Sequence, residues 1–422
     1  MQERSSPRMS DCLDADIGKE AAVMSSEFNA MIEGLQPALE AVGQPIEFAK
    51  GLPNELFTSD RYFAMERDQL FGRSWAVIGA GIDVPNPGDL KPVTFMGLPL
   101  LMVRNKAGEI GVFHNVCSHR GLELVNEKKN VSRLIRCPYH AWSFTLDGDL
   151  NQTPGIGGPG VNTCPGFEKA KHGLKPIRSA VWMDMVFVNL SGDAQPFEDF
   201  IAPLNERWHD YDFGLLAHGG THSSWTMELG ANWKFGVENH CDGYHLPMVH
   251  PELNAVSRLE DHYPIVGPEG YYAGQGSLAY NAMRPNNAPA LPHFPRISAD
   301  RQTVSEYISL FPNATIGVHI DHVWVLWFDP VSPSRTVERM EIYYPGKQVA
   351  GTDYTPVREE VHRFWYKVFQ EDLWAVEGLQ RGRSSPGFAG GAFSPAMDGP
   401  SHSFHKWAAA SLLENAGLAT AH

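Results

Sequence analysis

Two close pairs of cysteine and histidine lie in the first half of the sequence. One residue separates Cys117 from His119, two separate Cys137 from His140, and 17 lie between the pairs. Two thiolates on one iron and two imidazoles on the other would hold a [2Fe-2S] cluster at a higher reduction potential than four cysteines give. A structural zinc site is the alternative, but such zinc modules usually begin with two cysteines and end with two histidines. The mixed pairs therefore favour an electron-transfer cluster.

Two further histidines, His245 and His250, lie in the second half of the sequence. On one continuous helix this spacing would turn the two side chains about 140° apart. Both can bind the same metal only if the helix ends between them, and Pro247 predicts that end because it disfavours helix at Leu246. Two neutral imidazoles and one carboxylate on one face of iron(II) form the ligand set of O₂-activating enzymes. A carboxylate ligand is therefore expected elsewhere in the chain.

The strongest helical pattern of the C-terminal half offers this carboxylate. Apolar residues recur at helical spacing over residues 357–380, and Asp372 falls within the apolar stripe. A buried aspartate is costly unless it is paired or bound to metal, so Asp372 is the expected ligand rather than its neighbour Glu371. A buried salt bridge would explain Asp372 equally well on its own. The histidine pair and the cluster motif favour the metal-ligand interpretation.

The elements that must position these residues form two blocks. Residues 75–190 contain short β-rich runs separated by Gly, Pro and Asn, which predicts a small β domain. After a break at residues 192–195, further strands at 322–328 and 337–344 precede the helix that carries Asp372. The remainder is therefore expected to be an α+β domain.

This division predicts three segments. Residues 1–62 are expected to form an N-terminal arm that packs on the catalytic domain, residues 63–192 the cluster domain, and residues 193–422 the catalytic, iron-binding domain. Residues 267–295 and 384–400 are rich in Gly, Pro, Ala and Ser, which predicts long loops.

The composition argues against several classes of protein. A formal net charge of −15 disfavours a nucleic-acid partner. No apolar run approaches the roughly 18–20 residues that span a bilayer, and the N-terminus lacks the apolar core of a signal peptide. We therefore expect a cytoplasmic protein without a membrane partner. Five cysteines are too few for a disulfide framework in a chain of 422 residues, which fits the same compartment.

From about Leu56 to the C-terminus the sequence closely resembles the α subunits of Rieske ring-hydroxylating oxygenases. The matching positions are Cys117-x-His119, Cys137-x₂-His140, Asp242-x₂-His245-x₄-His250, and Asp372 followed by Glu377. Few families share both motifs. The resemblance implies an α+β protein in which a β-rich Rieske [2Fe-2S] domain precedes a catalytic domain whose antiparallel β-sheet is covered by helices, of the helix-grip (START-like) type.

The same resemblance implies a role for each matching ligand. The expected cluster ligands are His119 and His140 on the outer iron, and Cys117 and Cys137 on the inner iron. The expected ligands of a mononuclear Fe(II) are His245, His250 and Asp372.

Asp242 would be the catalytic bridge between the two centres. In the family this aspartate hydrogen-bonds a cluster histidine of the neighbouring subunit and a histidine of the iron site, which implies a homotrimer or an α₃β₃ assembly. From the residues alone, Asp242 precedes His245 by three positions, so a helix would present both on one face. A solvated surface aspartate is the alternative. Asn239, nearby in the sequence, is a candidate pocket residue.

The implied reaction is that of a terminal oxygenase acting on a small molecule with O₂. Electrons from NAD(P)H would arrive through a separate reductase, with or without a ferredoxin, because the chain has no nicotinamide-binding fingerprint. The Asp242-Gly-Tyr-His sequence resembles branches that hydroxylate aromatic compounds, including aromatic acids, and this is the first prediction. Residues 379–407 resemble the branch that oxidises choline, betaines and other N-methyl compounds, which is the second. A non-catalytic iron-sulfur electron-transfer protein is the third.

Overall fold

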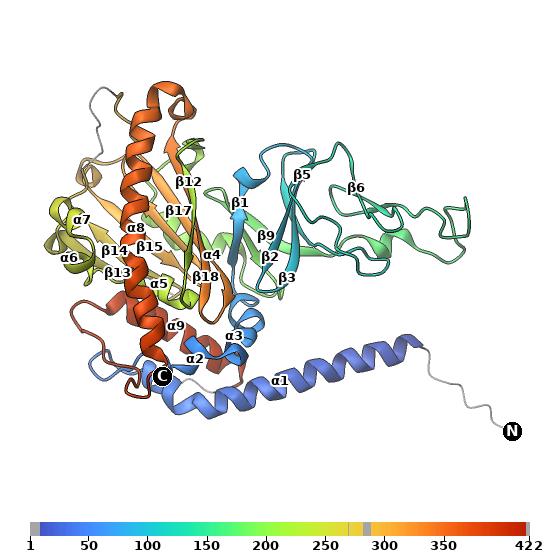
Figure 1. Ribbon diagram of the computed structural model, residues 1–422, viewed down its shortest axis with the longest axis horizontal. Coiled ribbons are helices and arrows are strands. Elements are labelled where there is room, and N and C mark those ends of the chain that lie inside the picture. Colours follow the sequence, from blue (N-terminus) through green and yellow to red (C-terminus); the bar gives the residue numbers. More distant parts are fainter. Residues whose placement is uncertain (1–8, 269, 282–287, 419–422) are drawn as a thin grey trace.

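The computed structural model describes residues 9–268, 270–281 and 288–418 (Figure 1). Two β-rich parts lie side by side along its long axis, and the helix α1 (Met9–Val42) runs below them in this view. None of the described helices is both long and apolar enough to cross a membrane.

The first β-rich part is a seven-stranded antiparallel sheet with a three-stranded sheet beside it. In sheet order, the larger sheet consists of β1 (Ala76–Ala80), β10 (Met185–Asn189), β9 (Pro176–Trp182), β4 (Ile110–His114), β3 (Leu98–Arg104), β2 (Asp89–Phe95) and β5 (Lys129–Asn130). The smaller sheet consists of β6 (Leu134–Arg136), β7 (Ser143–Thr145) and β8 (Leu150–Gln152). Cys117 follows β4 and Cys137 follows β6, so the two predicted cluster pairs lie in loops at strand ends.

The second part is built on an eight-stranded antiparallel sheet. Seven of its strands follow the order β11 (Leu216–His218), β18 (Arg335–Pro345), β17 (Val323–Ser332), β16 (Ala314–Val318), β15 (Ser305–Leu310), β14 (Tyr272–Ser277) and β13 (His262–Val266). The eighth, β12 (Ser224–Leu229), pairs with β18. Side chains of β17 and β18 alternate between two apolar clusters, one on each face, so both faces of this sheet are covered.

Strand β14 corrects the prediction of a loop over residues 267–295. Its sequence is rich in glycine because neighbouring groups approach closely: a Cβ at Gly274 would lie 2.0 Å from the carbonyl oxygen of Tyr307, and one at Gly276 would lie 2.2 Å from the ring of Tyr263. Glycine here therefore serves strand packing rather than loop formation.

Helices cover the face of the sheet that carries the predicted iron ligands. The long ones are α8 (Thr355–Arg383) and α9 (Gly399–Asn415) (Figure 1), and α5 (Trp233–Cys241) contacts both of them and strand β15. The shorter ones are α2 (Glu55–Thr58), α3 (Asp60–Glu66), α6 (Leu246–Val249) and α7 (Pro251–Val256). Helix α4 (Phe197–Arg207) packs in the apolar cluster on the opposite face of the sheet. On α8 the buried stripe of Val361, Trp365, Val368, Asp372 and Val376 faces the core, whereas the apolar side chain of Leu379 is exposed.

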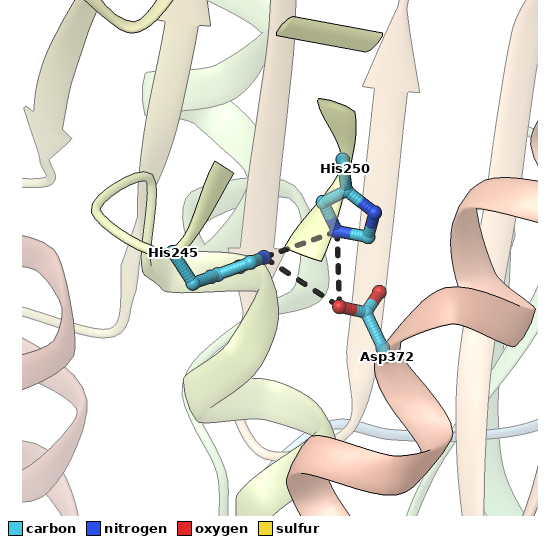
Figure 2. Close-up of side chains that lie close together, drawn as sticks. All are labelled: His245, His250 and Asp372. Carbon is cyan, nitrogen blue, oxygen red and sulfur yellow. Dashed lines mark hydrogen bonds and ion pairs between the residues drawn. The ribbon is translucent and has the colours of Figure 1, made fainter. Parts of the chain in front are cut away.

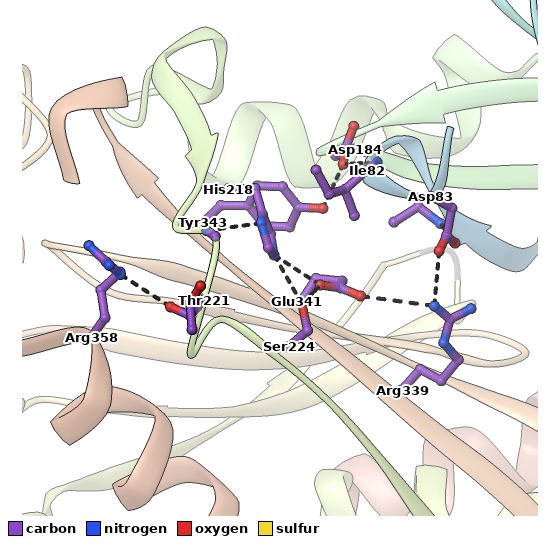
Figure 3. Close-up of polar contacts among 12 residues, drawn as sticks. Ile82, Asp83, Asp184, His218, Thr221, Ser224, Arg339, Glu341, Tyr343 and Arg358 are labelled. Carbon is purple, nitrogen blue, oxygen red and sulfur yellow. Dashed lines mark hydrogen bonds and ion pairs between the residues drawn. The ribbon is translucent and has the colours of Figure 1, made fainter. Parts of the chain in front are cut away.

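Polar side chains join the two sheets where they meet (Figure 3). The guanidinium of Arg339, on β18, lies 3.2 Å from the carboxylate of Asp83, which also pairs with Lys91 at 2.5 Å. Burial alone would raise the pKa of Asp83, but the charges of Arg339 and Lys91 outweigh burial, so its pKa is lowered. The hydroxyl of Tyr343 donates to Asp184 at 2.6 Å. The first β-rich part is thus held in one orientation on the second.

A buried ion pair anchors α5, which leads into the predicted iron site. The ammonium of Lys234 lies 2.5 Å from Glu66 of α3, and the two side chains are 1% and 0% exposed. The indole N–H of Trp233 donates to the second oxygen of Glu66 at 2.8 Å. Removing one partner would leave the other charge buried without compensation.

We therefore expect Glu66→Leu to lower the free energy of unfolding by about 3–5 kcal/mol, measured by urea denaturation of the iron-loaded protein. The double variant Glu66→Leu/Lys234→Met should recover most of the loss, because it leaves no unpaired charge. Glu228→Gln, which breaks an exposed pair with Arg335, is the control and should change stability little. An equal loss in the single and double variants would contradict the role of the pair.

Candidate metal centres

The two histidines of the predicted iron site lie in the turns that follow α5. This helix ends at Cys241, and Asp242 has an extended backbone with φ −93° and ψ 115°. The prediction that Pro247 ends the helix is therefore wrong. Pro247 lies in the first turn of α6, where its missing N–H is not needed, and Leu246 is helical. The helix ends before His245 rather than between the two histidines.

Three donor atoms converge from these turns and from the middle of α8 (Figure 2). His245 Nε2 lies 3.2 Å from His250 Nε2 and 3.5 Å from Asp372 Oδ1, and His250 Nε2 lies 3.0 Å from Asp372 Oδ1. Neighbouring ligands about 2.1 Å from one metal ion and at right angles to each other would be about 3 Å apart. The spacing therefore fits one metal ion.

Hydrogen bonds on the far side of each ring show which nitrogen faces the metal position. His245 Nδ1 lies 2.9 Å from Asp242 Oδ2, and His250 Nδ1 lies 3.0 Å from Glu371 Oε2. An ionised carboxylate only accepts, so both Nδ1 atoms carry the proton and both Nε2 atoms present lone pairs. Two such lone pairs and the oxygen of Asp372 face one another. A metal cation between them would remove their repulsion, so the donor set fits the predicted mononuclear iron.

The charges around Asp372 favour its ionised form. Burial alone would raise the pKa of Asp372, but the hydrogen bond and charge of His250 outweigh it and lower the pKa. Glu338, buried on β18, behaves in the opposite way, because burial and the charge of Asp372 raise its pKa to about 8. The site therefore presents the ionised carboxylate of Asp372, and at neutral pH Glu338 is mostly protonated behind it.

Glu371 is a functional residue that sequence reasoning missed. The sequence favours Asp372 over Glu371 as the metal ligand, and Glu371 is not one of the three converging groups. Its carboxylate instead accepts a hydrogen bond from His250 and holds that ring in place. Glu371 precedes Asp372 on α8, so its side chain lies about 100° away around the helix axis and reaches Nδ1 of His250, the ring nitrogen that faces away from the metal position. An acidic pair on a buried helix face was the available signal.

Asp242 contacts the iron site by a route other than the predicted one. The helix has ended at this residue, so Asp242 and His245 do not share a helix face, and that prediction is wrong. A tight turn brings the two together instead, with Asp242 Oδ1 accepting from the backbone N–H of Tyr244 at 2.6 Å and Oδ2 contacting His245. The side chain of Asp242 is 29% exposed, which leaves it reachable by another chain.

The four predicted cluster ligands are brought together at one end of the first β-rich part. Cys117 and Cys137 are buried and form no disulfide, and burial raises the pKa of the Cys117 thiol. The rings of His119 and His140 lie nearer the surface, with centroids 4.7 Å apart, and His119 stacks on Trp142. The thiols thus lie inside and the imidazoles outside, in the order expected of the two irons.

This arrangement also bears on the zinc alternative. Within the described part of the chain, His245, His250 and Asp372 are the one group of three or more ligand-type residues whose donor atoms all lie within 4.8 Å of one another. The cysteines and histidines of the cluster motif do not converge on a single point. A cluster with two metal positions fits such a spread better than one zinc ion.

The converging ligands line a cavity of about 60 Å³, which we name the inner cavity. Its other described lining residues are Asn239, His240, Leu246, Leu253, His262, Gln275, Tyr307, Trp324, Trp365, Val368 and Phe369. Asn239 was expected here. The sequence assigned none of the aromatic residues to a pocket, because aromatic residues in strands and buried helix faces are usually plain core.

Two family models match this chain. The Rieske [2Fe-2S] domain matches residues 74–165, and the ring hydroxylating alpha subunit (catalytic domain) matches residues 217–414. The chain belongs to the Rieske ring-hydroxylating oxygenase α-subunit family. It is therefore an oxygenase with a [2Fe-2S] cluster and a mononuclear non-haem iron, and the predicted cofactors are confirmed. The individual ligands remain predictions, which the geometry supports.

Relatives of this Rieske oxygenase include proteins with different substrates. The glycine betaine monooxygenase oxygenase subunit of Pseudomonas aeruginosa is 25% identical over 92% of this chain and 96% of its own length. A quaternary ammonium Rieske monooxygenase has the same fold, with a TM-score of 0.72 and 23% identity over 88% of this chain and 97% of that one. Naphthalene 1,2-dioxygenase from Rhodococcus gives a TM-score of 0.70 and 17% identity over 91% and 98%. The predicted fold class is confirmed.

We expect Asp372→Ala to lose the mononuclear iron and retain both cluster irons, because the cluster ligands lie in the other domain. Elemental analysis combined with the visible absorption of the cluster measures the two centres separately. Glu360→Ala, at a half-buried position on the same helix and outside the described lining of the metal site, should keep all of its iron. Retention of the mononuclear iron in Asp372→Ala would overturn the ligand assignment.

Glu371→Gln is expected to weaken binding of the mononuclear iron by about 10–100-fold, since residues that orient metal-bound histidines have effects of this size. The amide can no longer accept with a full charge from His250 Nδ1–H. Competition with a calibrated iron chelator measures the change. An affinity equal to that of the wild type would show that Glu371 does not orient His250.

Proposed function

We propose that this Rieske terminal oxygenase demethylates an N-methylated ammonium compound. Insertion of one oxygen atom of O₂ into a methyl C–H bond gives an N-hydroxymethyl product, which releases formaldehyde and leaves the demethylated amine. Two electrons and two protons reduce the other oxygen atom to water. Similarity to a glycine betaine monooxygenase subunit over nearly the whole of both chains supports this second prediction over hydroxylation of an aromatic ring.

The lining of the inner cavity is the observation that carries the proposal. Tyr307, Trp324, Trp365 and Phe369 supply aromatic rings, and none of the described lining residues is Lys or Arg. Aromatic faces attract quaternary ammonium groups by about 0.5–2 kcal/mol per ring. An aromatic acid, in contrast, would bring a carboxylate into a cavity that already holds Asp372. The lining thus suits a cation better than an anion.

A buried hydrogen-bond chain fixes the orientation of Trp365. Its indole N–H donates to His322 Nε2 at 2.9 Å, and His322 Nδ1 contacts the carboxylate of Asp321 at 2.8 Å. The hydroxyl of Tyr280 donates to the same carboxylate oxygen at 3.0 Å. His322 and Asp321 are almost completely buried, so this chain is protected from water. The ring of Trp365 is therefore held in place before the substrate arrives.

Around the iron position, Asp242 and Glu371 orient the two histidines by hydrogen bonds. The bound iron supplies O₂ activation, and electrons from NAD(P)H reach the cluster through a separate reductase, with or without a ferredoxin. Asp242 accepts from His245 Nδ1–H and remains exposed, so it can also accept from a cluster histidine of a neighbouring subunit. We propose on this basis a homotrimer or an α₃β₃ assembly.

The predicted division of the chain also stands as a proposal. Residues 63–192 would form the Rieske domain and residues 193–422 the catalytic domain. The arm of residues 1–62 would pack on the catalytic domain, and contacts between α1 and α9 support that packing. The non-catalytic alternative has little support, because the three converging donors and Asp242 form a site with no use in simple electron transfer.

The first test is a reaction of purified protein with NADH and a surrogate reductase, offered a panel of N-methyl amines and aromatic acids under ¹⁸O₂. We expect formaldehyde in proportion to NADH consumed, together with the demethylated amine detected by mass spectrometry. Asp372→Ala is the control and should form neither product. Labelled hydroxylated rings, without formaldehyde, would restore the aromatic prediction.

Trp365→Leu should raise the KM for the cationic substrate by about tenfold, because loss of one well-placed aromatic face costs about 1–2 kcal/mol. Trp374→Leu makes the same change at a position that is 66% exposed on the same helix, and it should leave KM unchanged. Initial rates over a range of substrate concentrations measure both. Equal KM values in the two variants would exclude cation binding by Trp365.

A further inference from the structure

The inner cavity shares a wall with a second, larger cavity, which we name the outer cavity. The outer cavity has a volume of about 350 Å³, against about 60 Å³ for the inner one. His262 and Gln275 line both, so these two side chains separate them. Ligand sites in proteins usually measure about 300–1,000 Å³. The inner cavity alone is therefore too small for a whole substrate.

Only the outer cavity has exposed residues in its described lining. Glu260, Pro264 and Ala396 are exposed there, whereas the described residues of the inner cavity are all buried or half-buried. Glu260 adds a carboxylate at the surface, and the described lining of the outer cavity contains no Lys or Arg. The outer cavity thus reaches the surface, and its described lining favours cations over anions.

Hydrogen bonds fix the side chains of the shared wall. His262 begins β13 opposite Ser277 of β14, and Gln275 lies two residues before Ser277, so both side chains point from the same face of the sheet. Gln275 Nε2 donates to the backbone carbonyl of Asp242 at 3.3 Å, which orients the amide. Gln275 Oε1 therefore accepts from His262 Nδ1–H at 2.8 Å. The wall is one connected polar pair.

The remaining nitrogen of His262 is also occupied. Ser257 Oγ lies 3.0 Å from His262 Nε2, and its hydroxyl donates there because Nδ1 carries the ring proton. Burial lowers the pKa of His262, so the ring is neutral at pH 7. The wall then adds no positive charge of its own that would repel a cation.

Gly243 explains how Gln275 can lie so close to the turn that carries the iron ligands. A Cβ at Gly243 would lie 2.4 Å from Gln275 Oε1, so any larger residue must displace the amide. That amide is the end of a flexible side chain, and it can move without a shift of the backbone. Gly243→Ala should therefore break the contact between Gln275 and His262 without unfolding the site.

We propose that His262 and Gln275 form a polar partition that determines which substrates fit. The reacting methyl group would occupy the inner cavity, and the rest of the substrate would extend across the partition into the outer cavity. The choice of N-methylated cations as substrates rests on the proposed function. The partition itself rests on the two cavities and their shared wall.

The test compares two probes, tetramethylammonium and benzyltrimethylammonium, that differ in the part that must extend across the partition. Their dissociation constants are measured by isothermal titration calorimetry on the iron-loaded protein. In Gln275→Ala and Gly243→Ala, the affinity for the larger probe relative to the smaller should rise by about tenfold, the usual scale for a change in pocket shape. Turnover of short and long N-methyl amines should shift in the same direction.

Met397→Ala is the matched control. Met397 lines the outer cavity but not the inner one, so its removal enlarges the outer cavity without opening the wall. The ratio of affinities should then stay at the wild-type value. Cluster absorption and iron content verify that each variant is folded and loaded. An unchanged ratio in both wall variants, or an equal change in Met397→Ala, would overturn the proposal.

The same experiment separates failure of the partition from failure of the proposed function. If the wild type binds neither ammonium probe but binds neutral aromatic compounds, the proposed substrate class is wrong. The ratio is then measured with benzene and naphthalene, and a shift in the wall variants would still support the partition. If the wild type binds the ammonium probes and the ratio does not respond, only the partition is wrong.

Discussion

The convergence of one aspartate and two histidines on a single point is the constraint on which the catalytic domain depends. The histidines come from the turns after α5 and the aspartate from the middle of α8. Each helix must therefore lie on the same face of the sheet with an error well below the length of a metal-ligand bond. The apolar stripe of α8 fixes the helix that carries the aspartate, and the buried pair of Lys234 and Glu66 fixes α5, which precedes the histidines.

The groups behind the ligands connect the iron to the rest of the molecule. Asp242 holds His245, and Glu371 holds His250, so each ring is fixed by a carboxylate that also sets its tautomer. The backbone carbonyl of Asp242 in turn accepts from Gln275. One short turn thus joins the predicted electron bridge, a predicted iron ligand and the wall between the two cavities. A substitution that moves this turn is therefore expected to displace all three.

The sequence predicts what depends on local spacing and misses what depends on packing. The cluster motif and the apolar stripe around Asp372 are local patterns, and the structure brings their residues together. The helix end predicted at Pro247 is wrong, because a proline in the first turn of a helix cannot be distinguished by sequence from one that ends a helix. Strand β14 was missed because its glycines serve close strand packing. Gln275 and His262 carry no local signal, since their partners lie in other elements.

Residues that line the inner cavity say more about the substrate than the sequence around Asp242 does. The aromatic prediction came from the sequence around Asp242, but both carboxylate oxygens of Asp242 are engaged by Tyr244 and His245. Asp242 is not among the described residues that line the inner cavity. Its predicted role is in electron transfer, so it says little about the molecule being oxidised. Trp365 and Phe369 do line the inner cavity, and aromatic faces suit the methylated cation of the proposed function.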